Sequence, residues 1–275
     1  MMRAGLLLLL AALTQLGALS VHAAVSAPCG TWKGTGECED VSFDMSDRAS
    51  LQRGAALFMN YCLGCHTTRY ARYERFAEDV GVDIDLLKEH LIFDGSQPGS
   101  LIVNGMKVAD AKKWFGAPPP DLSLITRARS PQWLYTYLLA FYRDETRPLG
   151  HNNRVFPNVG MPHVLEELQG VQRQVCAPVR TYAENGGVRR DPLTRELITE
   201  ESCDVLQVDA GTGMMGETEY RQAAYDLANY LHYTAEPYRS QRISVGIYVV
   251  FYLLLLIVIL WMLNREFQKD VADKH

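Results

Sequence analysis

At residues 61–67 the chain reads Tyr61-Cys62-Leu63-Gly64-Cys65-His66-Thr67, which contains the pattern Cys-x-x-Cys-His. Two thiols three residues apart can each bond one vinyl group of the same porphyrin, and the imidazole that follows lies beneath the ring as proximal iron ligand. The pattern therefore predicts a covalent haem c, attached through Cys62 and Cys65 and ligated by His66. Because the pattern occurs once, one such haem is expected.

Two other uses of these residues are conceivable. A thioredoxin-like redox pair would be expected to follow a β-strand. Half of a zinc site would be expected to have a second Cys/His pair at close spacing. The sequence supplies neither context, so it favours haem attachment.

Amphipathic segments on either side of the motif predict a helical core. Asp47 can cap a helix that leads into the motif, and a second helix is expected from Thr218 to Tyr233, ended by Pro237. One face of each helix is apolar at helical spacing: Leu51, Ala55, Phe58 and Cys62 in the first, and Tyr220, Ala224, Leu227 and Leu231 in the second. The expected fold is mainly α, with long irregular loops.

The N-terminus predicts an export signal over residues 1–24. Arg3 precedes the apolar run 6–13, and small residues at Ala23 and Ala24 form a cleavage site. The alternative is an uncleaved anchor helix, for which the strongly apolar core is short.

The C-terminus predicts a membrane-spanning helix over residues 243–263. These 21 residues carry no charge, and as a helix they would extend about 31 Å, close to the thickness of a hydrocarbon core. Tyr248 and Trp261 lie near its ends as interface anchors. With a cleaved leader, residues 25–240 would form a periplasmic haem domain, and residues 264–275 a cytoplasmic tail of a single-pass inner-membrane protein.

Six cysteines in an exported chain suggest that all of them are used covalently. Apart from the motif, Cys29 with Cys38 and Cys176 with Cys203 are plausible disulfides. Four cysteines allow three pairings, and their spacing does not choose among them.

A sixth iron ligand must come from a distant part of the chain. Met161 lies in an irregular loop punctuated by Pro and Gly, held between Gly160 and Pro162. The residues alone leave several alternatives open, namely Met106, Met214, Met215, His151 and His163.

Taken together, the residues resemble the cytochrome c1 family, the haem subunits of ubiquinol–cytochrome c oxidoreductase (the cytochrome bc1 complex), in its proteobacterial form. The resemblance covers nearly the whole chain after the leader. It rests on Arg53-Gly54, the Cys-x-x-Cys-His motif, the run 114–123 (Trp-Phe-Gly-Ala-Pro-Pro-Pro-Asp-Leu-Ser), Arg127-Ala128-Arg129, Gly160-Met161-Pro162, Tyr233-Thr234-Ala235-Glu236-Pro237 and the C-terminal anchor.

The resemblance implies Met161 as the axial thioether. It also implies that Arg129 pairs with a haem propionate, that Tyr135 lies near the haem edge, and that Pro119 and Pro120 wall the pocket. A planar guanidinium suits a propionate, which agrees with the assignment of Arg129.

The chain departs from mitochondrial members of the family between Gln169 and Thr218. A polar insert that contains Cys176, Cys203 and Asn185-Gly186-Gly187 replaces a much shorter link. An Asn-Gly-Gly turn with polar flanks favours a hairpin. The stretch from Asp94 to Asp110 is also not a close match.

The expected function is a single-electron relay from a Rieske iron–sulfur protein, through the haem, to a c-type cytochrome, with cytochrome b as a further partner. No side chain is expected to perform substrate chemistry, so the subunit is not itself an enzyme. A net charge of −5, with acidic runs at 37–47 and 74–94, favours a cationic protein partner and gives no indication of nucleic-acid binding.

Two alternatives remain at this point. A peroxidase-like enzyme or gas sensor would need an open sixth position with polar distal groups, which His151 or His163 could supply. The chain could also be the haem subunit of another membrane-anchored complex, such as an oxidase or a dehydrogenase.

Overall fold

The computed structural model describes residues 27–272 except 35 and 182–186, so the predicted signal at 1–24 lies outside the described residues. The α-helices are α2 (Arg48–Leu57), α3 (Tyr73–Val80), α4 (Ile84–His90), α5 (Val108–Phe115), α6 (Ile125–Ala128), α7 (Pro131–Leu139), α8 (Glu166–Gln169), α9 (Glu217–Ala235) and α10 (Arg239–Ala272). A 3-10 turn, η1 (Trp32–Gly34), and a π-helix, η2 (Phe58–Cys62), are also present. The strands form three antiparallel pairs: β1 (Thr68–Arg72) with β2 (Leu101–Ile102), β3 (Phe141–Arg143) with β4 (His151–Asn153), and β5 (Gln172–Arg180) with β6 (Thr199–Val208).

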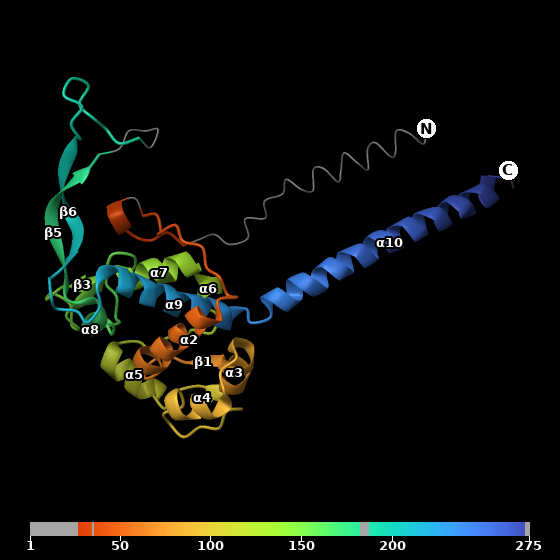
Figure 1. The fold of residues 1–275 in the computed structure, drawn as a ribbon, viewed down its shortest axis with the longest axis horizontal. Helices are drawn as coiled ribbons and strands as arrows, with labels where there is room; N and C mark the ends of the chain where they lie inside the picture. The colour runs from red at the N-terminus through yellow and green to blue at the C-terminus, as the bar shows by residue number, and fades with distance from the viewer. Residues whose placement is uncertain (1–26, 35, 182–186, 273–275) are drawn as a thin grey trace.

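The centre of the helical domain is the crossing of α2 and α9, which lie against each other in Figure 1. Asp47 caps α2 as predicted, because its side chain accepts a hydrogen bond from the Ser50 amide. All eight predicted stripe residues of the two helices are buried. The predicted helical core is therefore confirmed.

The Arg53-Gly54 pair has a structural reason at this crossing. A Cβ atom on Gly54 would lie 2.0 Å from the carbonyl oxygen of Asp226, so only glycine lets the two backbones approach this closely. Arg53 binds the buried Asp226 carboxylate in a fork, with Nε–Oδ2 2.6 Å and Nη2–Oδ1 3.0 Å. The pair joins α2, which leads to the motif, to α9.

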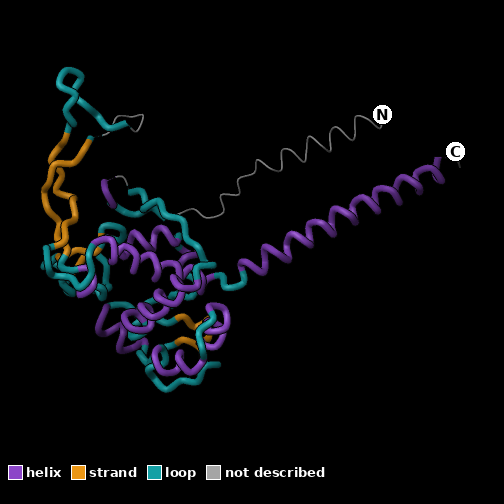
Figure 2. The backbone as a smooth tube through the Cα atoms, viewed as in Figure 1, coloured by secondary structure: helices purple, strands orange, loops and turns teal. Residues whose placement is uncertain are grey.

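The insert after Gln169 forms a long hairpin, β5–β6, as the sequence favoured, although Asn185 and Gly186 of the predicted turn lie outside the described residues. Figures 1 and 2 show it projecting from one end of the domain. The Cys176–Cys203 disulfide links its two strands, and the Cys29–Cys38 disulfide closes a loop near the start of the described chain. Both plausible pairings are therefore present.

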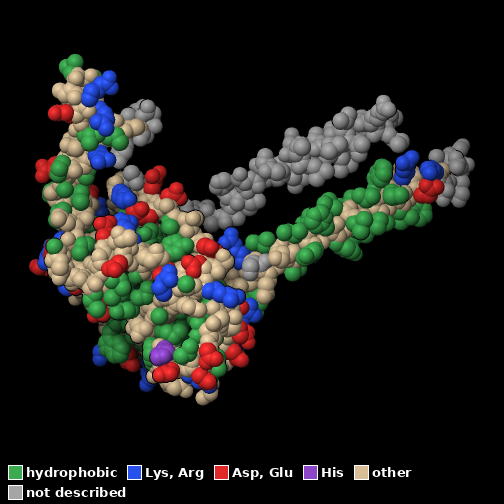
Figure 3. All heavy atoms as spheres, in the orientation of Figure 1, with side chains coloured by type: hydrophobic (Ala, Val, Ile, Leu, Met, Phe, Trp, Pro, Cys, Tyr) green, Lys and Arg blue, Asp and Glu red, His purple; other side chains and the backbone are tan. Residues whose placement is uncertain are grey.

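The helix α10 leaves the domain directly after Pro237 (Figure 1). Residues 241–269 are long and apolar enough to cross a membrane, and none of their strongest apolar window is buried against the domain. Figure 3 shows apolar side chains along most of its length. The helix continues through the predicted tail to Ala272, and it fits the single anchor that the sequence predicts.

Candidate haem site

The two thiols of the motif lie where α2 gives way to a turn. The helix passes into the π-helix η2, and the amides of Cys65 and His66 then both donate to the Cys62 carbonyl, at 3.0 and 2.8 Å. Such π-helical turns are frequent at functional sites. Cys62 and Cys65 are the free cysteines of the described chain, since the other four form disulfides.

His66 is oriented by its backbone partner. Its Nδ1 lies 2.8 Å from the carbonyl oxygen of Pro120, and because a carbonyl can only accept, Nδ1 must carry the proton. Burial lowers the pKa of His66 and so keeps the ring neutral. The lone pair is then on Nε2, which is the arrangement that metal-binding histidines adopt.

Asp121 holds the proline loop, residues 118–120, against the attachment motif through hydrogen bonds. Its Oδ2 accepts from the Thr67 hydroxyl at 2.6 Å and from the Arg69 amide at 2.9 Å, while Leu122 donates its amide to the Thr67 carbonyl at 2.7 Å. Although burial raises its pKa, hydrogen bonds from Ser123, Thr67 and Arg69 lower the pKa of Asp121 to about 2. This role of Asp121 is not evident from the sequence pattern, although the residue directly follows the proline run.

Met161 lies half-buried against the apolar core, and the Tyr137 hydroxyl donates to its sulfur at 3.4 Å. Met214, by contrast, is largely exposed, at 76 %. Both ring nitrogens of His151 are hydrogen bonded, to Leu149 and Glu166. Met214 and His151 are thus poorly placed as ligands, whereas Met161 is packed against the core, and its role as iron ligand stays a prediction.

The other predicted pocket residues are placed as follows. The Arg129 guanidinium lies 5.1 Å from the centre of the Trp133 ring and makes no ion pair with a carboxylate of the described residues. Pro119 is half-buried and Pro120 exposed. Tyr135 is buried and meets Phe43 edge-on.

Tyr137, on the same helix as Tyr135, contacts Met161, while the position of Tyr135 near the haem edge stays a prediction. Residues two apart on a helix point about 200° apart, so the two tyrosines leave α7 on different sides. Trp133 and Tyr137, four residues apart, stack at 5.1 Å on one face. The four-residue spacing of Trp133 and Tyr137 is the sequence signal that places these two rings together.

The residues present fit a covalent haem. Two free thiols, a neutral imidazole with a free Nε2 and a thioether are the donor set that the group requires. The motif follows a helix and not a strand, which does not suit a thioredoxin-like pair. Within residues 27–272, apart from the gaps, no group of three or more His, Cys, Asp or Glu side chains could hold a metal ion, which disfavours zinc.

The mainly helical domain, the motif at the end of α2 and the apolar C-terminal helix together define the class of anchored c-type cytochromes. The family model described as "Cytochrome C1 family" matches residues 206–271. A cytochrome c1 from Allochromatium vinosum is 45% identical over 233 residues, which is 85% of this chain and 89% of that protein. The chain belongs to the cytochrome c1 family.

Two further relatives extend the comparison. A protein named ammonia monooxygenase gamma subunit, from Nitrosomonas europaea, is 36% identical over 228 residues, covering 83% of this chain and 86% of that protein. A cytochrome b/c1 from Bradyrhizobium diazoefficiens is 24% identical over 260 residues, covering 85% of this chain and 34% of that longer protein. The family assignment therefore places the chain among haem proteins of electron transport.

Proposed function

We propose that this chain carries one haem c, bonded to Cys62 and Cys65 and ligated by His66 and Met161, and that it relays single electrons in a quinol–cytochrome c reductase. The observation that carries the proposal is the hydrogen bond from His66 Nδ1 to the Pro120 carbonyl. It leaves a neutral ring with Nε2 available to iron, directly beside two free thiols. Membership of the cytochrome c1 family supports the same cofactor.

The pocket around the haem is proposed to consist of Arg129, Tyr135, Pro119 and Pro120. Arg129 is held over Trp133 and has no carboxylate partner among the described residues, so its fork of donors is available to a propionate. Pro120 holds His66 through its carbonyl, and Pro119 precedes it on the same loop. The thioether of Met161 would complete the iron coordination from the opposite side.

The bound haem would supply reversible one-electron oxidation and reduction of iron. The residues of this chain would hold the ligand set constant between the two states, and a thioether ligand raises the reduction potential. The proposed donor is a Rieske iron–sulfur protein and the proposed acceptor is a c-type cytochrome, with cytochrome b as the partner in the membrane. No residue is assigned to substrate chemistry.

The proposed topology places residues 25–240 in the periplasm, residues 243–263 in the inner membrane and residues 264–275 in the cytoplasm, after removal of a signal at 1–24. It is supported by the single long apolar helix of the described chain. A spanning helix joined to the domain by a short link at Pro237 would hold the haem at a set height above the membrane.

An acidic surface supports a cationic acceptor. Acidic side chains gather over the region of α3 and α4 in Figure 3. The exposed acidic residues of this surface are Glu74, Glu78, Asp83, Asp85 and Glu89. Charge complementarity of this kind raises association rates at low salt.

The test combines mass spectrometry with isolation of the complex. Chain purified from membranes should carry one haem on a peptide containing Cys62 and Cys65, and ferric protein should show the long-wavelength charge-transfer band of methionine ligation. Mild detergent should retain cytochrome b and a Rieske protein. Free thiols at both positions would refute haem attachment, and companions of another kind, such as ammonia monooxygenase subunits, would instead favour the alternative of a different complex.

A further inference from the structure

A buried chain of side-chain hydrogen bonds connects the Met161 loop to the end of α7. His163 Nε2 donates to Gln169 Oε1 at 2.6 Å, and Gln169 Nε2 donates to Gln172 Oε1 at 3.1 Å. Gln172 Nε2 then donates to the carbonyls of Leu139, at 3.0 Å, and Phe141, at 2.5 Å. We call His163, Gln169 and Gln172 the relay.

The polar groups of the relay are all hydrogen bonded only when three consecutive elements pack together against Leu139 and Phe141. His163 follows Met161 in the loop, Gln169 ends α8, and Gln172 begins β5. All three side chains are less than a tenth exposed, at 6, 7 and 7%. Buried amides without partners are costly, so this arrangement strongly selects one position of the loop.

The relay lies at the base of the β5–β6 hairpin, where residues 167–171 cross residues 209–215; we call this crossing the neck. A Cβ on Gly213 would lie 2.6 Å from the Gln169 carbonyl carbon, so the two backbones are in direct contact. The amides of Met214 and Met215 donate to the carbonyls of Glu167 and Leu168, at 2.9 and 3.0 Å. The neck thus ties the insert to the segment that follows Met161.

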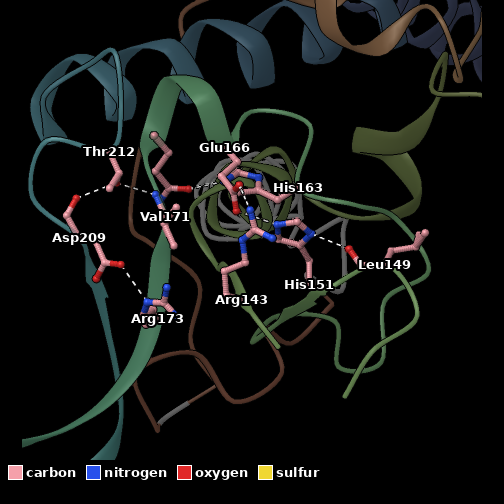
Figure 4. Close-up of polar contacts among 10 residues, drawn as sticks. Arg143, Leu149, His151, His163, Glu166, Val171, Arg173, Asp209 and Thr212 are labelled. Carbon is pink, nitrogen blue, oxygen red and sulfur yellow. Dashed lines mark hydrogen bonds and ion pairs between the residues drawn. The ribbon is translucent and has the colours of Figure 1, made fainter. Parts of the chain in front are cut away.

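Side chains around the relay reinforce the neck (Figure 4). The Thr212 hydroxyl accepts from the Val171 amide and donates to the Asp209 carbonyl, while Arg143 and His151 both converge on Glu166 of α8. The His163 ring stacks on Phe141, with centroids 4.9 Å apart and planes 3° from parallel. Both ends of α8 are therefore anchored.

The relay also reaches the helix that carries Tyr137. Its last acceptors are the carbonyls of Leu139, which ends α7, and of Phe141, which begins β3, and Tyr137 of α7 donates to the sulfur of Met161. The loop that presents the thioether is thus joined to the helix that contacts it through the whole relay, in which Gln172 makes the last link, to the Leu139 carbonyl.

We propose that the neck of the β5–β6 insert clamps the Met161 loop against α7, with Gln172 as the positioning residue that keeps the thioether on the iron. The proposal rests on the proposed function, in which Met161 is the sixth ligand. It assigns a role to the base of the insert, and it assigns none to the projecting strands beyond the disulfide.

The experiment measures how readily the loop opens. Full-length ferric protein in mild detergent is mixed with imidazole, and the loss of the long-wavelength charge-transfer band is followed in time. Gln172→Met keeps the length of the side chain and removes its hydrogen bonds. Opening of the loop breaks the hydrogen bonds of Gln172 in the parent protein, whereas the variant lacks these bonds. We therefore expect imidazole to replace the thioether about tenfold faster, or more, in the variant.

The matched control is Gln174→Met, two residues along the same strand. Gln174 is exposed and bonds only within the hairpin, to Cys203 and Asp204. Its replacement rate should equal that of the parent protein. Replacing residues 178–201 by an Asn-Gly turn should also leave the rate unchanged, because the neck and the relay remain.

The outcomes are separable. Equal rates for Gln172→Met and Gln174→Met would overturn the clamp, and so would a large acceleration on shortening the hairpin beyond the disulfide. A missing charge-transfer band in the parent protein would overturn the assignment of Met161 itself. If Gln172→Met does not accumulate with haem, Gln172→Asn shortens the same side chain by one methylene, and the same difference from Gln174→Asn is expected.

Discussion

The two sides of the proposed haem site are built differently. On the His66 side, the thiols and the imidazole lie within five residues at the end of a helix, and one loop of prolines covers them. On the Met161 side, the thioether lies in an irregular loop that α7, α8 and the neck of the insert hold in place. The attachment residues of the first side are neighbours in the chain, whereas the second side is held only by contacts among several segments and should open first.

The largest effect should come from removing the ligand on each side in turn. His66→Ala removes the proximal ligand next to both attachment points, so we expect almost no haem protein to accumulate. Met161→Ala should retain covalent haem but lose the charge-transfer band and have a lower reduction potential, because the thioether raises it. Haem-stained gels, visible spectra and redox titration measure both, and equal accumulation of the two variants would contradict the comparison.

Gly54→Ala should strongly destabilise the helix that leads to the His66 side. Its Cβ would lie 2.0 Å from the Asp226 carbonyl oxygen, so the α2–α9 crossing must separate, at a cost of about 3 kcal/mol in the free energy of unfolding. Denaturant unfolding followed by circular dichroism measures the change. Gly105→Ala is the control, because no atom lies within 4 Å of a Cβ there and the residue is outside the attachment motif. Similar stabilities for the two variants would disprove the close crossing.

Asp121→Asn tests whether the Asp121 carboxylate stabilises the proline loop, and the pH dependence of the free energy of unfolding is the readout. The folded-state pKa of Asp121, about 2, is below the ordinary aspartate value of 3.8, so its stabilisation is present above pH 3.8 and is lost as the pH falls through about 2. The shift corresponds to about 2 kcal/mol. The variant should be less stable than the parent at neutral pH, and the difference should shrink in acid. A difference that does not change with pH, measured by denaturant unfolding, would rule out this origin.

Tyr137→Phe should have the smallest effect and sharpens the description of the Met161 side. It removes only the hydroxyl that donates to the Met161 sulfur. That hydrogen bond draws electron density from the thioether, so its loss should lower the reduction potential by an amount on the order of tens of millivolts. Tyr252→Phe, at an exposed tyrosine of α10 outside the proposed pocket, is the control. An equal shift in the control would contradict this role of Tyr137.

The sequence correctly predicted those features that depend on residues a few positions apart in the chain. The stripes of α2 and α9, the cap at Asp47 and the hairpin of the insert follow from periodicity and turn chemistry, which act over a few residues. It was weaker for the disulfides, where three pairings were open until the fold brought Cys29 to Cys38 and Cys176 to Cys203. It did not find Asp121, Tyr137 or Gln172, whose partners are distant in the chain.

The sequence by itself determined the attachment motif, the helices that bear it and the apolar helix that follows the domain, because each is encoded by residues that are neighbours in the chain. Only the tertiary structure decided which tyrosine contacts Met161, 24 residues away, and which carbonyl orients His66, 54 residues away. Such contacts form when loops without a repeating pattern pack against one another. Their geometry depends on the whole fold and not on any local sequence signal.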